Sequence, residues 1–227
     1  MTKTRAPKVA VLEAPRLPGQ FEAGRLESDV ELEGVVVTEQ DLSDGGVFDL
    51  SLEGSRVERC RLTGAVFERL SLKDCEFVDC EMSEAFLKLM EAERVRFAAC
   101  RMTGAVLTSA AMHQVRFTDC RMEGVNLRMS EGLLLAFEAC EMREIDLYGG
   151  SLTNSTFTGC DLTGAELSEL RLDNVRFEGG SLADIRGAMS LRGATVSGDL
   201  VLPMVPAVFA AAGVLIEDRK TANEVDE

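Results

Sequence analysis

The chain has 227 residues, of which 46% are hydrophobic and 28% are charged, and its net charge is −15. This length is enough for one domain, or two small ones, with a sizeable buried core. The negative charge argues against direct binding of nucleic acid, which depends on lysine and arginine side chains that displace counterions from phosphates. No apolar run approaches the roughly 20 residues that span a bilayer, and the first residues lack the pattern of an export signal. We therefore expect a cytoplasmic protein with no membrane contact.

The N-terminal segment precedes any regular pattern. Residues 1–18 contain four basic residues, one acidic residue and three prolines. Such a composition is typical of a chain end without a core of its own. We expect residues 1–18 to form a flexible tail and residues 19–31 to form an imperfect first coil of the structure that follows.

A period of five residues dominates the rest of the chain. From Leu32 to Leu182 every fifth residue is large and apolar, except Ala92 and Gly132, through 31 consecutive positions. A second series of inward positions, with smaller side chains such as Ala65, stands two residues before the first. Neither an α-helix nor a flat strand keeps a period of five on one face, so the chain must turn a corner in every unit.

Residue identity also repeats every 20 residues, which gives four units per coil. One column of equivalent positions is phenylalanine from Phe77 to Phe177, and the next is methionine from Met82 to Met142. Side chains that stack on identical neighbours are typical of solenoids, in which each repeat contacts the next. We predict an all-β solenoid with four sides over residues 19–198, its coils separated by the strand spacing of about 4.8 Å.

The units Cys160–Gly164 (CDLTG) and Ala165–Glu169 (AELSE) show the repeat most clearly. With them the chain resembles the pentapeptide-repeat family, whose motif is A-(D/N)-L-x-x. The resemblance implies a right-handed quadrilateral β-helix, a pentapeptide-repeat solenoid. This sequence departs from the motif at its second position, where residues such as Arg61, Glu81 and Arg101 replace the usual Asp or Asn.

The five-residue pattern ends before residues 199–217. Pro203, Pro206 and Gly213 in this segment predict a short helix, since proline suits the first turn and glycine the C-cap. The segment resembles the C-terminal capping helix of mycobacterial-type fluoroquinolone-resistance proteins, and this resemblance implies a homodimer through that end. We expect residues 218–227 to be disordered. The candidate cap and dimer residues are Val205, Val208, Phe209 and Leu215.

The seven cysteines occupy the small inward position of their units, and six of them form one column from Cys60 to Cys160. A metal site needs convergent ligands, usually with a C-x2-C pair, and neither is present. Disulfides between coils fit this spacing, but a cytoplasmic location disfavours them, so we interpret the cysteines as small buried residues. The single histidine, His113, lies on an outward position without a paired nucleophile. We predict no catalytic residues, no cofactor and no metal, and therefore no enzyme activity.

Two surfaces are candidates for contact with a partner. The first coils contain acidic residues and no lysine or arginine over residues 31–55, and they form either a partner surface or an ordinary solvated one. A second, apolar set lies on outward positions of successive coils and forms either a contact stripe or a local bulge near Gly132 that buries it. The acidic candidates are Glu31, Glu33, Glu39, Asp41, Asp44, Asp49 and Glu53, and the apolar candidates are Val66, Phe86, Leu89, Val106 and Met129.

The sequence leaves two functions open. One is a protein-interaction scaffold that binds through the apolar stripe. The other rests on the resemblance to quinolone-resistance pentapeptide-repeat proteins, which implies an acidic DNA mimic that binds DNA gyrase or another type II topoisomerase and modulates it. The absence of inserted loops and the outward arginines weaken this second hypothesis. In both cases the expected partner is a protein.

Overall fold

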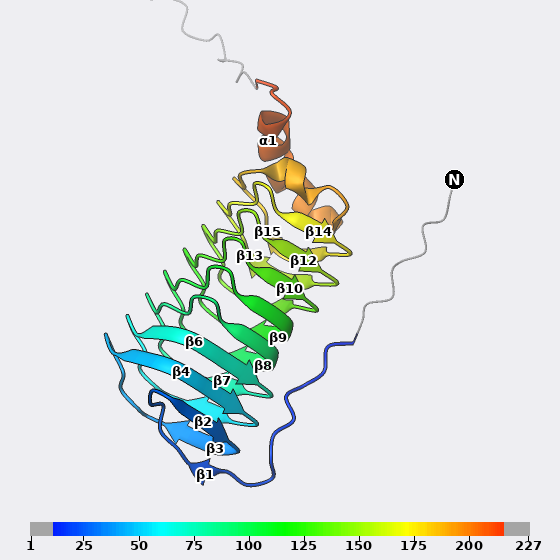
Figure 1. Ribbon diagram of the computed structural model, residues 1–227. Coiled ribbons are helices and arrows are strands. Elements are labelled where there is room, and N and C mark those ends of the chain that lie inside the picture. Colours follow the sequence, from blue (N-terminus) through cyan, green and yellow to red (C-terminus); the bar gives the residue numbers. More distant parts are fainter. Residues whose placement is uncertain (1–10, 216–227) are drawn as a thin grey trace, which may run out of the picture.

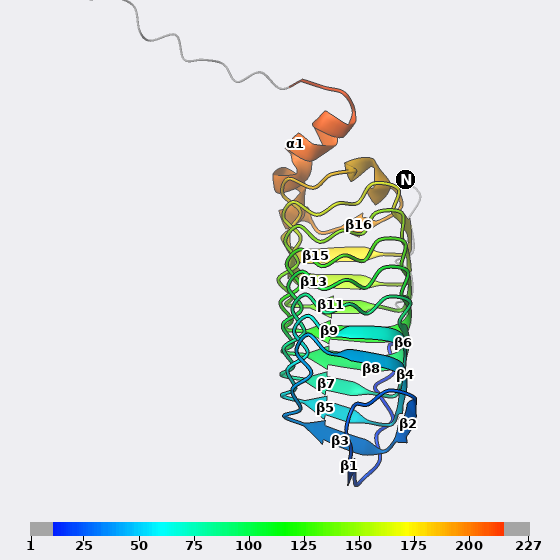
Figure 2. The same ribbon diagram turned by 60° about the vertical axis from the view of Figure 1, so that its left-hand side comes forward.

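Each five-residue unit forms one side of a coil, and the coils stack into a parallel β-solenoid (Figures 1 and 2). The computed structural model describes residues 11–215. The strands are β1 (Glu22–Ala23), β2 (Val30–Glu33), β3 (Val35–Thr38), β4 (Gly46–Glu53), β5 (Arg56–Glu58), β6 (Val66–Lys73), β7 (Glu76–Val78), β8 (Glu91–Ala98), β9 (Ala111–Thr118), β10 (Glu131–Leu133), β11 (Ala136–Glu138), β12 (Ser151–Thr153), β13 (Thr156–Asp161), β14 (Arg171–Asp173), β15 (Arg176–Ser181) and β16 (Thr195–Val196). The helices are the 3-10 helices η1 (Ala188–Leu191) and η2 (Gly198–Leu200) and the α-helix α1 (Val201–Ala211).

The solenoid has four faces, which we name after the central core residue that each contributes to one coil: Phe67, Leu72, Phe77 and Met82. Strands pair along the Leu72 and Phe77 faces, with Leu72 opposite Leu52 and Phe77 opposite Phe97, so the offset between coils is 20 residues. On the Phe67 and Met82 faces most coils are joined by isolated parallel bridges at the same offset. Strand pairing reaches the Phe67 face between β4 and β6 and the Met82 face between β13 and β15. The predicted all-β solenoid with four sides is therefore confirmed.

Every corner places a residue in the left-handed region of backbone conformation. Around one coil these residues are Arg69, Asp74, Asp79 and Glu84, with φ between 53° and 60°. The non-glycine residues with positive φ in residues 11–215 include no valine, isoleucine or threonine. This follows from sterics, because a branched Cβ makes that conformation most costly. The corner geometry thus explains why residues branched at Cβ are missing from the corner positions of the described repeats.

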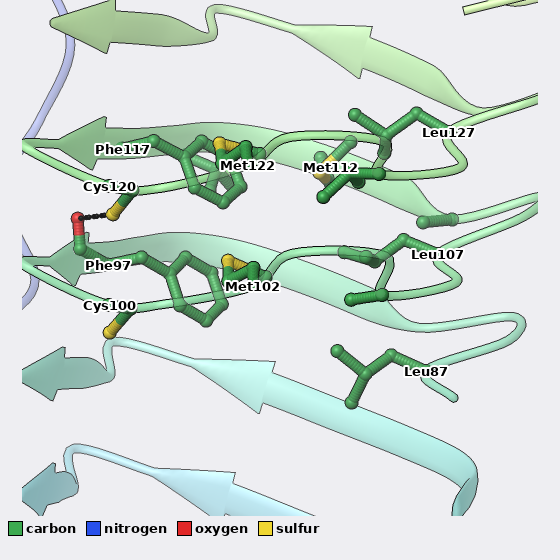
Figure 3. Packing of buried hydrophobic residues seen from close by; sticks show 14 of the residues in the cluster. Leu87, Phe97, Cys100, Met102, Leu107, Met112, Phe117, Cys120, Met122 and Leu127 are labelled. Atoms are coloured by element: carbon green, nitrogen blue, oxygen red, sulfur yellow. Dashed lines mark hydrogen bonds between the residues drawn. The ribbon is translucent and has the colours of Figure 1, made fainter. Parts of the chain in front are cut away.

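The core consists of columns of like residues. Six phenylalanine rings from Phe77 to Phe177 stack with centroids 4.7–5.0 Å apart. Figure 3 shows Phe97 and Phe117 on successive coils, with Met102 below Met122 beside them. This stacking confirms the columns predicted from the 20-residue repeat. The weak core position, Gly132, is filled by its neighbours, since a Cβ there would meet Leu135 Cδ1 at 2.5 Å and Leu152 Cδ2 at 2.7 Å.

The regular spacing fails at both ends of the solenoid. At the first coil, Glu22 pairs with Val35, an offset of only 13 residues, which agrees with the imperfect coil expected there. At the other end Phe177 pairs with Val196, an offset of 19 residues. Helix α1 then covers part of the last coil with Met204, Ala207 and Val208. No helix in the described part of the chain is long and apolar enough to cross a membrane.

Residues 11–18 fall within the expected flexible tail, but in the structure they lie along the solenoid. The dark blue segment in Figure 1 runs beside the coils towards β1. The backbone amide of Arg16 donates to Asp74 Oδ1 at 2.9 Å, and that of Glu13 donates to Gln114 Oε1 at 3.0 Å. We call residues 11–18 the strap. The rest of the expected tail, residues 1–10, and the C-terminal tail, residues 218–227, lie outside the described residues.

Candidate interaction surfaces

The acidic candidates surround the first coils and do not form a single patch. Glu31 and Glu33 lie on β2, Asp41 lies on the Met82 face, and Asp44 and Asp49 occupy two different corners. The reason is geometric, since the chain turns a corner every five residues and residues 31–53 make slightly more than one coil. The sequence shows that these carboxylates lie in the first coils of the solenoid, but it does not show on which face each one lies.

Basic residues of the next coil pair with four of the seven acidic candidates. Arg69 contacts Asp49, and the other three pairs have nitrogen–oxygen distances between 2.5 and 3.5 Å. Those pairs are Glu39–Arg59, Asp41–Arg61 and Glu53–Lys73. Within residues 11–215, Glu31, Glu33 and Asp44 make no such pair. The first coils therefore present a weaker negative field than the sequence alone suggested.

The apolar candidates are stacked and exposed. Val66, Phe86 and Val106 form consecutive bridges on the Phe67 face, and Phe86 is 40% exposed while the two valines are half-buried. Leu89 and Met129 occupy the corner between the Phe67 and Leu72 faces, with φ near +57° and exposures of 63% and 59%. The pairing of β9 with β10 continues in register at Gly132, so the alternative of a bulge that buries the stripe is wrong.

Phe48 is an exposed aromatic residue that the sequence analysis did not single out. It lies on β4 on the same Phe67 face and is 46% exposed. Its position in the unit is one after the core residue Val47, where the aligned residue of the next coil is Glu68. A phenylalanine at an outward position where the next two coils carry Glu68 and Lys88 was the signal that could have revealed it.

A groove brings the two candidate sets together. It follows the corner between the Phe67 and Leu72 faces and has a volume of about 680 Å³. Leu89 from the apolar set lines it, together with Glu31 and Asp49 from the acidic set and with Arg69 and Glu91. The groove therefore combines an exposed apolar side chain with a surplus of carboxylates. Such a surface suits a partner that offers apolar and basic side chains.

The candidates for the C-terminal contact face in different directions. Phe209 is 44% exposed and Leu215 is 92% exposed, whereas Val208 packs against the end of the core and Val205 is half-buried. Val208 and Phe209 are adjacent, and adjacent residues point about 100° apart on an α-helix. Leu202, which is 81% exposed, joins Phe209 and Leu215 as an outward apolar residue that the sequence analysis did not name.

All seven cysteines are free and buried, as the sequence analysis interpreted them. The Cys120 thiol donates to the Phe97 carbonyl oxygen at a sulfur–oxygen distance of 3.5 Å, which is the dashed line in Figure 3. Burial raises the pKa of the Cys75 thiol to about 11. A buried thiol with a raised pKa is a poor nucleophile, so we assign Cys75 to packing. The other six cysteines are also buried, and their thiols donate to backbone carbonyl groups of their own coil or of the preceding one.

These features define an elongated repeat protein that presents its side chains on four stacked faces. Residues 71–132 and 90–165 match the family model for the pentapeptide repeat region. Residues 71–165 of the chain therefore contain the repeats of the pentapeptide-repeat family. No curated protein matches the sequence.

Three solved structures that resemble the chain are one resistance protein and two pentapeptide-repeat proteins. A trypsin-treated variant of QnrB1, a plasmid-mediated fluoroquinolone resistance protein, has 19% identity and a TM-score of 0.38, over 91% of this chain and 100% of that chain. The protein Rfr23 from the cyanobacterium Cyanothece has 14% identity and a TM-score of 0.38, over 47% of this chain and 64% of that chain. HetL, which is involved in heterocyst differentiation regulation in the cyanobacterium Nostoc, has 14% identity and a TM-score of 0.28, over 78% and 87%. At such scores these likenesses add nothing to the fold established by the strand register.

Proposed function

We propose that the chain is a non-enzymatic interaction protein that binds a protein partner at the corner between the Phe67 and Leu72 faces. The observation that carries this proposal is the groove in which exposed Leu89 lies beside Glu31 and Asp49, with exposed Phe86 around the corner on the same coil. A rigid solenoid supports such a surface well, because the coils hold the contact side chains in place before binding. The partner would contribute apolar and basic side chains.

Capture of a partner by the purified full chain tests this proposal. Phe86→Asp and Leu89→Asp should each abolish capture from a native extract, because they place a charge within the apolar contact. Aspartate tolerates the left-handed conformation at residue 89, so the fold should persist, and circular dichroism checks this. Asn126→Asp is the matched control, since it adds the same charge further along the Phe86 column. Equal capture by the Phe86 and Asn126 variants would contradict the proposal.

The proposed assembly is a homodimer through the C-terminal helix. Helix α1 carries no charged residue, and Leu202, Phe209 and Leu215 are exposed on or next to it. Apolar side chains gathered at one end of a polar rod favour burial against an identical end.

The alternative function is an acidic mimic of DNA that binds DNA gyrase or another type II topoisomerase. The net charge of −15 and the carboxylates Glu31, Glu33 and Asp44 without basic partners among the described residues favour it. Four ion pairs on the same coils reduce the field that a basic DNA saddle would attract, so we place it second. A supercoiling assay with purified gyrase decides, since a mimic should inhibit at micromolar protein and a Glu31→Lys, Glu33→Lys variant should inhibit less. If the parent chain does not inhibit gyrase, the hypothesis of a DNA mimic is excluded.

A further inference from the structure

An ion pair is buried at a corner of the solenoid. Arg94 donates through Nε and Nη2 to the two carboxylate oxygens of Asp74, at 2.7 and 2.8 Å. The side chains are only 9% and 7% exposed, whereas the corner pair Asp49–Arg69 has exposures of 40% and 73%. Both pairs occupy the corner position of their five-residue units, but they lie at neighbouring corners of the coil. The strap, which passes along the Asp74 corner, accounts for the difference.

The strap contacts one column of corner residues on successive coils. Near β1 its Pro18 lies over Gly34 and Gly54, where an added Cβ would come within 3.7 Å of the proline ring. Further along, the amide of Arg16 donates to Asp74 and that of Glu13 donates to Gln114. Beyond them Leu12 lines a cavity of about 390 Å³ with Leu134. We call the column Gly34, Gly54, Asp74, Arg94, Gln114 and Leu134 the strap corner.

The spacing of these contacts matches the repeat of an extended peptide. Asp74 and Gln114 are two coils apart, which is about 9.6 Å at the strand spacing. Glu13 and Arg16 are three residues apart, which is about 9.3 Å in a polyproline II chain. That conformation has three residues per turn, so amides three residues apart point to the same side. The Glu13 and Arg16 side chains also pair with each other at 2.8 Å, as expected for residues on one side of such a chain.

Apolar contacts accompany these hydrogen bonds at both ends of the strap. Pro18 lies over Gly34 and Gly54 at a distance that suits van der Waals packing, and the half-buried Leu12, Pro15 and Leu17 turn towards the solenoid. The strap corner thus supplies hydrogen-bond acceptors at Asp74 and Gln114, two coils apart, with glycines on one side of them and Leu134 on the other. This is the chemistry that recognises an extended, proline-containing peptide through its backbone.

We propose that the strap corner is a peptide-binding groove and that residues 11–18 are its occupant within the same chain. The groove binds one amide at every third residue of an extended segment and an apolar side chain beside Leu134. Occupation by the strap closes the groove to other peptides of the same kind, because a tethered segment has an effective concentration in the millimolar range. This site lies on a different corner from the surface proposed above, and neither proposal depends on the other.

Amide hydrogen exchange on the full chain tests the contact. Gln114→Ala removes the acceptor for the Glu13 amide and should speed its exchange by about fivefold, the factor that corresponds to one ordinary hydrogen bond. Glu144→Ala is the matched control, since residue 144 is an exposed corner residue with φ of 54° against 56° for residue 114, and it should leave the Glu13 amide unchanged. Equal exchange in all three proteins overturns the proposal. Protection that falls on tenfold dilution would show that the strap comes from a second copy, which also overturns it.

A labelled peptide with the sequence of residues 11–18 tests the groove itself. The full-length variant Leu12→Glu, Leu17→Glu leaves the groove intact and weakens the strap, so it should bind the peptide at least tenfold more tightly than the parent chain. Adding Gln114→Ala to that variant should abolish the gain, and adding Glu144→Ala should not. Fluorescence anisotropy measures the binding. Absence of peptide binding to the strap variant, or equal binding to the parent chain, overturns the proposal.

Discussion

At the scale of single residues, position around the coil decides what a substitution costs. Asp74 and Asp49 are both corner aspartates that pair with an arginine of the next coil, but only the Asp74–Arg94 pair is buried. We expect Asp74→Asn to lower the free energy of unfolding by about 2 kcal/mol, because it weakens two charge-assisted hydrogen bonds of buried Arg94, which then keeps only the exposed Glu93 as a charged partner. Asp49→Asn should cost less than about 1 kcal/mol, since an exposed pair contributes little. Urea unfolding at neutral pH measures both, and equal losses would contradict the assignment.

The same pair predicts a dependence on pH. Hydrogen bonds from Arg94 hold the pKa of Asp74 below its ordinary value. A carboxylate with a lower pKa in the folded state stabilises the fold fully above its unfolded pKa of about 3.9, and this contribution is lost as the pH falls through the folded pKa. The difference in unfolding free energy between the parent chain and Asp74→Asn should therefore shrink below about pH 4. Urea titrations between pH 6 and pH 2 measure it, and a constant difference would refute the linkage.

Truncation of a phenylalanine should cost far more stability inside the solenoid than on its surface. Phe117 stacks on Phe97 at 4.9 Å and on Phe137 at 5.0 Å, so Phe117→Ala removes contacts on two coils and leaves a cavity. We expect a loss of about 3–5 kcal/mol in unfolding free energy. Phe86→Ala should change it by no more than about 0.5 kcal/mol, as for other surface positions. A large loss at Phe86 would mean that this side chain supports the fold, and would argue against its role as a contact residue.

At the scale of elements, the sequence predicted the strands and faces through their period but not the exact contacts of the caps. The column from Phe77 to Phe177 fixed the number of sides, because only a four-sided coil places those rings above one another. Helix α1 had no such repeat to guide it. Proline and glycine located the segment, but which side chains face the core depends on how the helix settles on the last coil, so Val208 was grouped with Phe209.

The proposed dimer contact is therefore best tested on the outward side of α1. Phe209→Asp should convert a dimer into a monomer, because it buries a charge in an apolar two-fold contact, while the melting temperature of the solenoid changes little. Light scattering coupled to size exclusion measures the mass. Ala212→Asp at the exposed C-terminal end of the helix is the control for an added charge. A parent chain that is already monomeric, or a variant of unchanged mass, would refute the contact.

At the scale of the whole molecule, the regular core explains why the fold was predictable and the surfaces were not. Inward residues obey the period because stacking constrains them, and a period can be read without knowledge of the structure. The identity of an outward residue is constrained only where it occupies a corner with positive φ. The strap is the clearest example of a contact that the sequence did not predict. Residues 11–18 have no period, and their position depends on hydrogen-bond acceptors at Asp74 and Gln114, which are far away in the sequence. The groove lined by Glu31 and Leu89 was equally hard to predict from the sequence, because its residues come from different coils.

A solenoid whose coils contact only their neighbours should open from its ends. The first coils are weakly packed, with Val30, Leu32 and Leu42 only partly buried, whereas β8 and β9 lie in the middle of the stacked columns. We expect amide exchange to be slowest in β8 and β9 and faster in β2 and β16, and the measurement is native-state exchange followed by mass spectrometry. Because the strap runs from Gly34 to Leu134, Gln114→Ala should speed exchange in β2 more than in β14. Uniform protection along the chain would show instead that the solenoid opens as one cooperative unit.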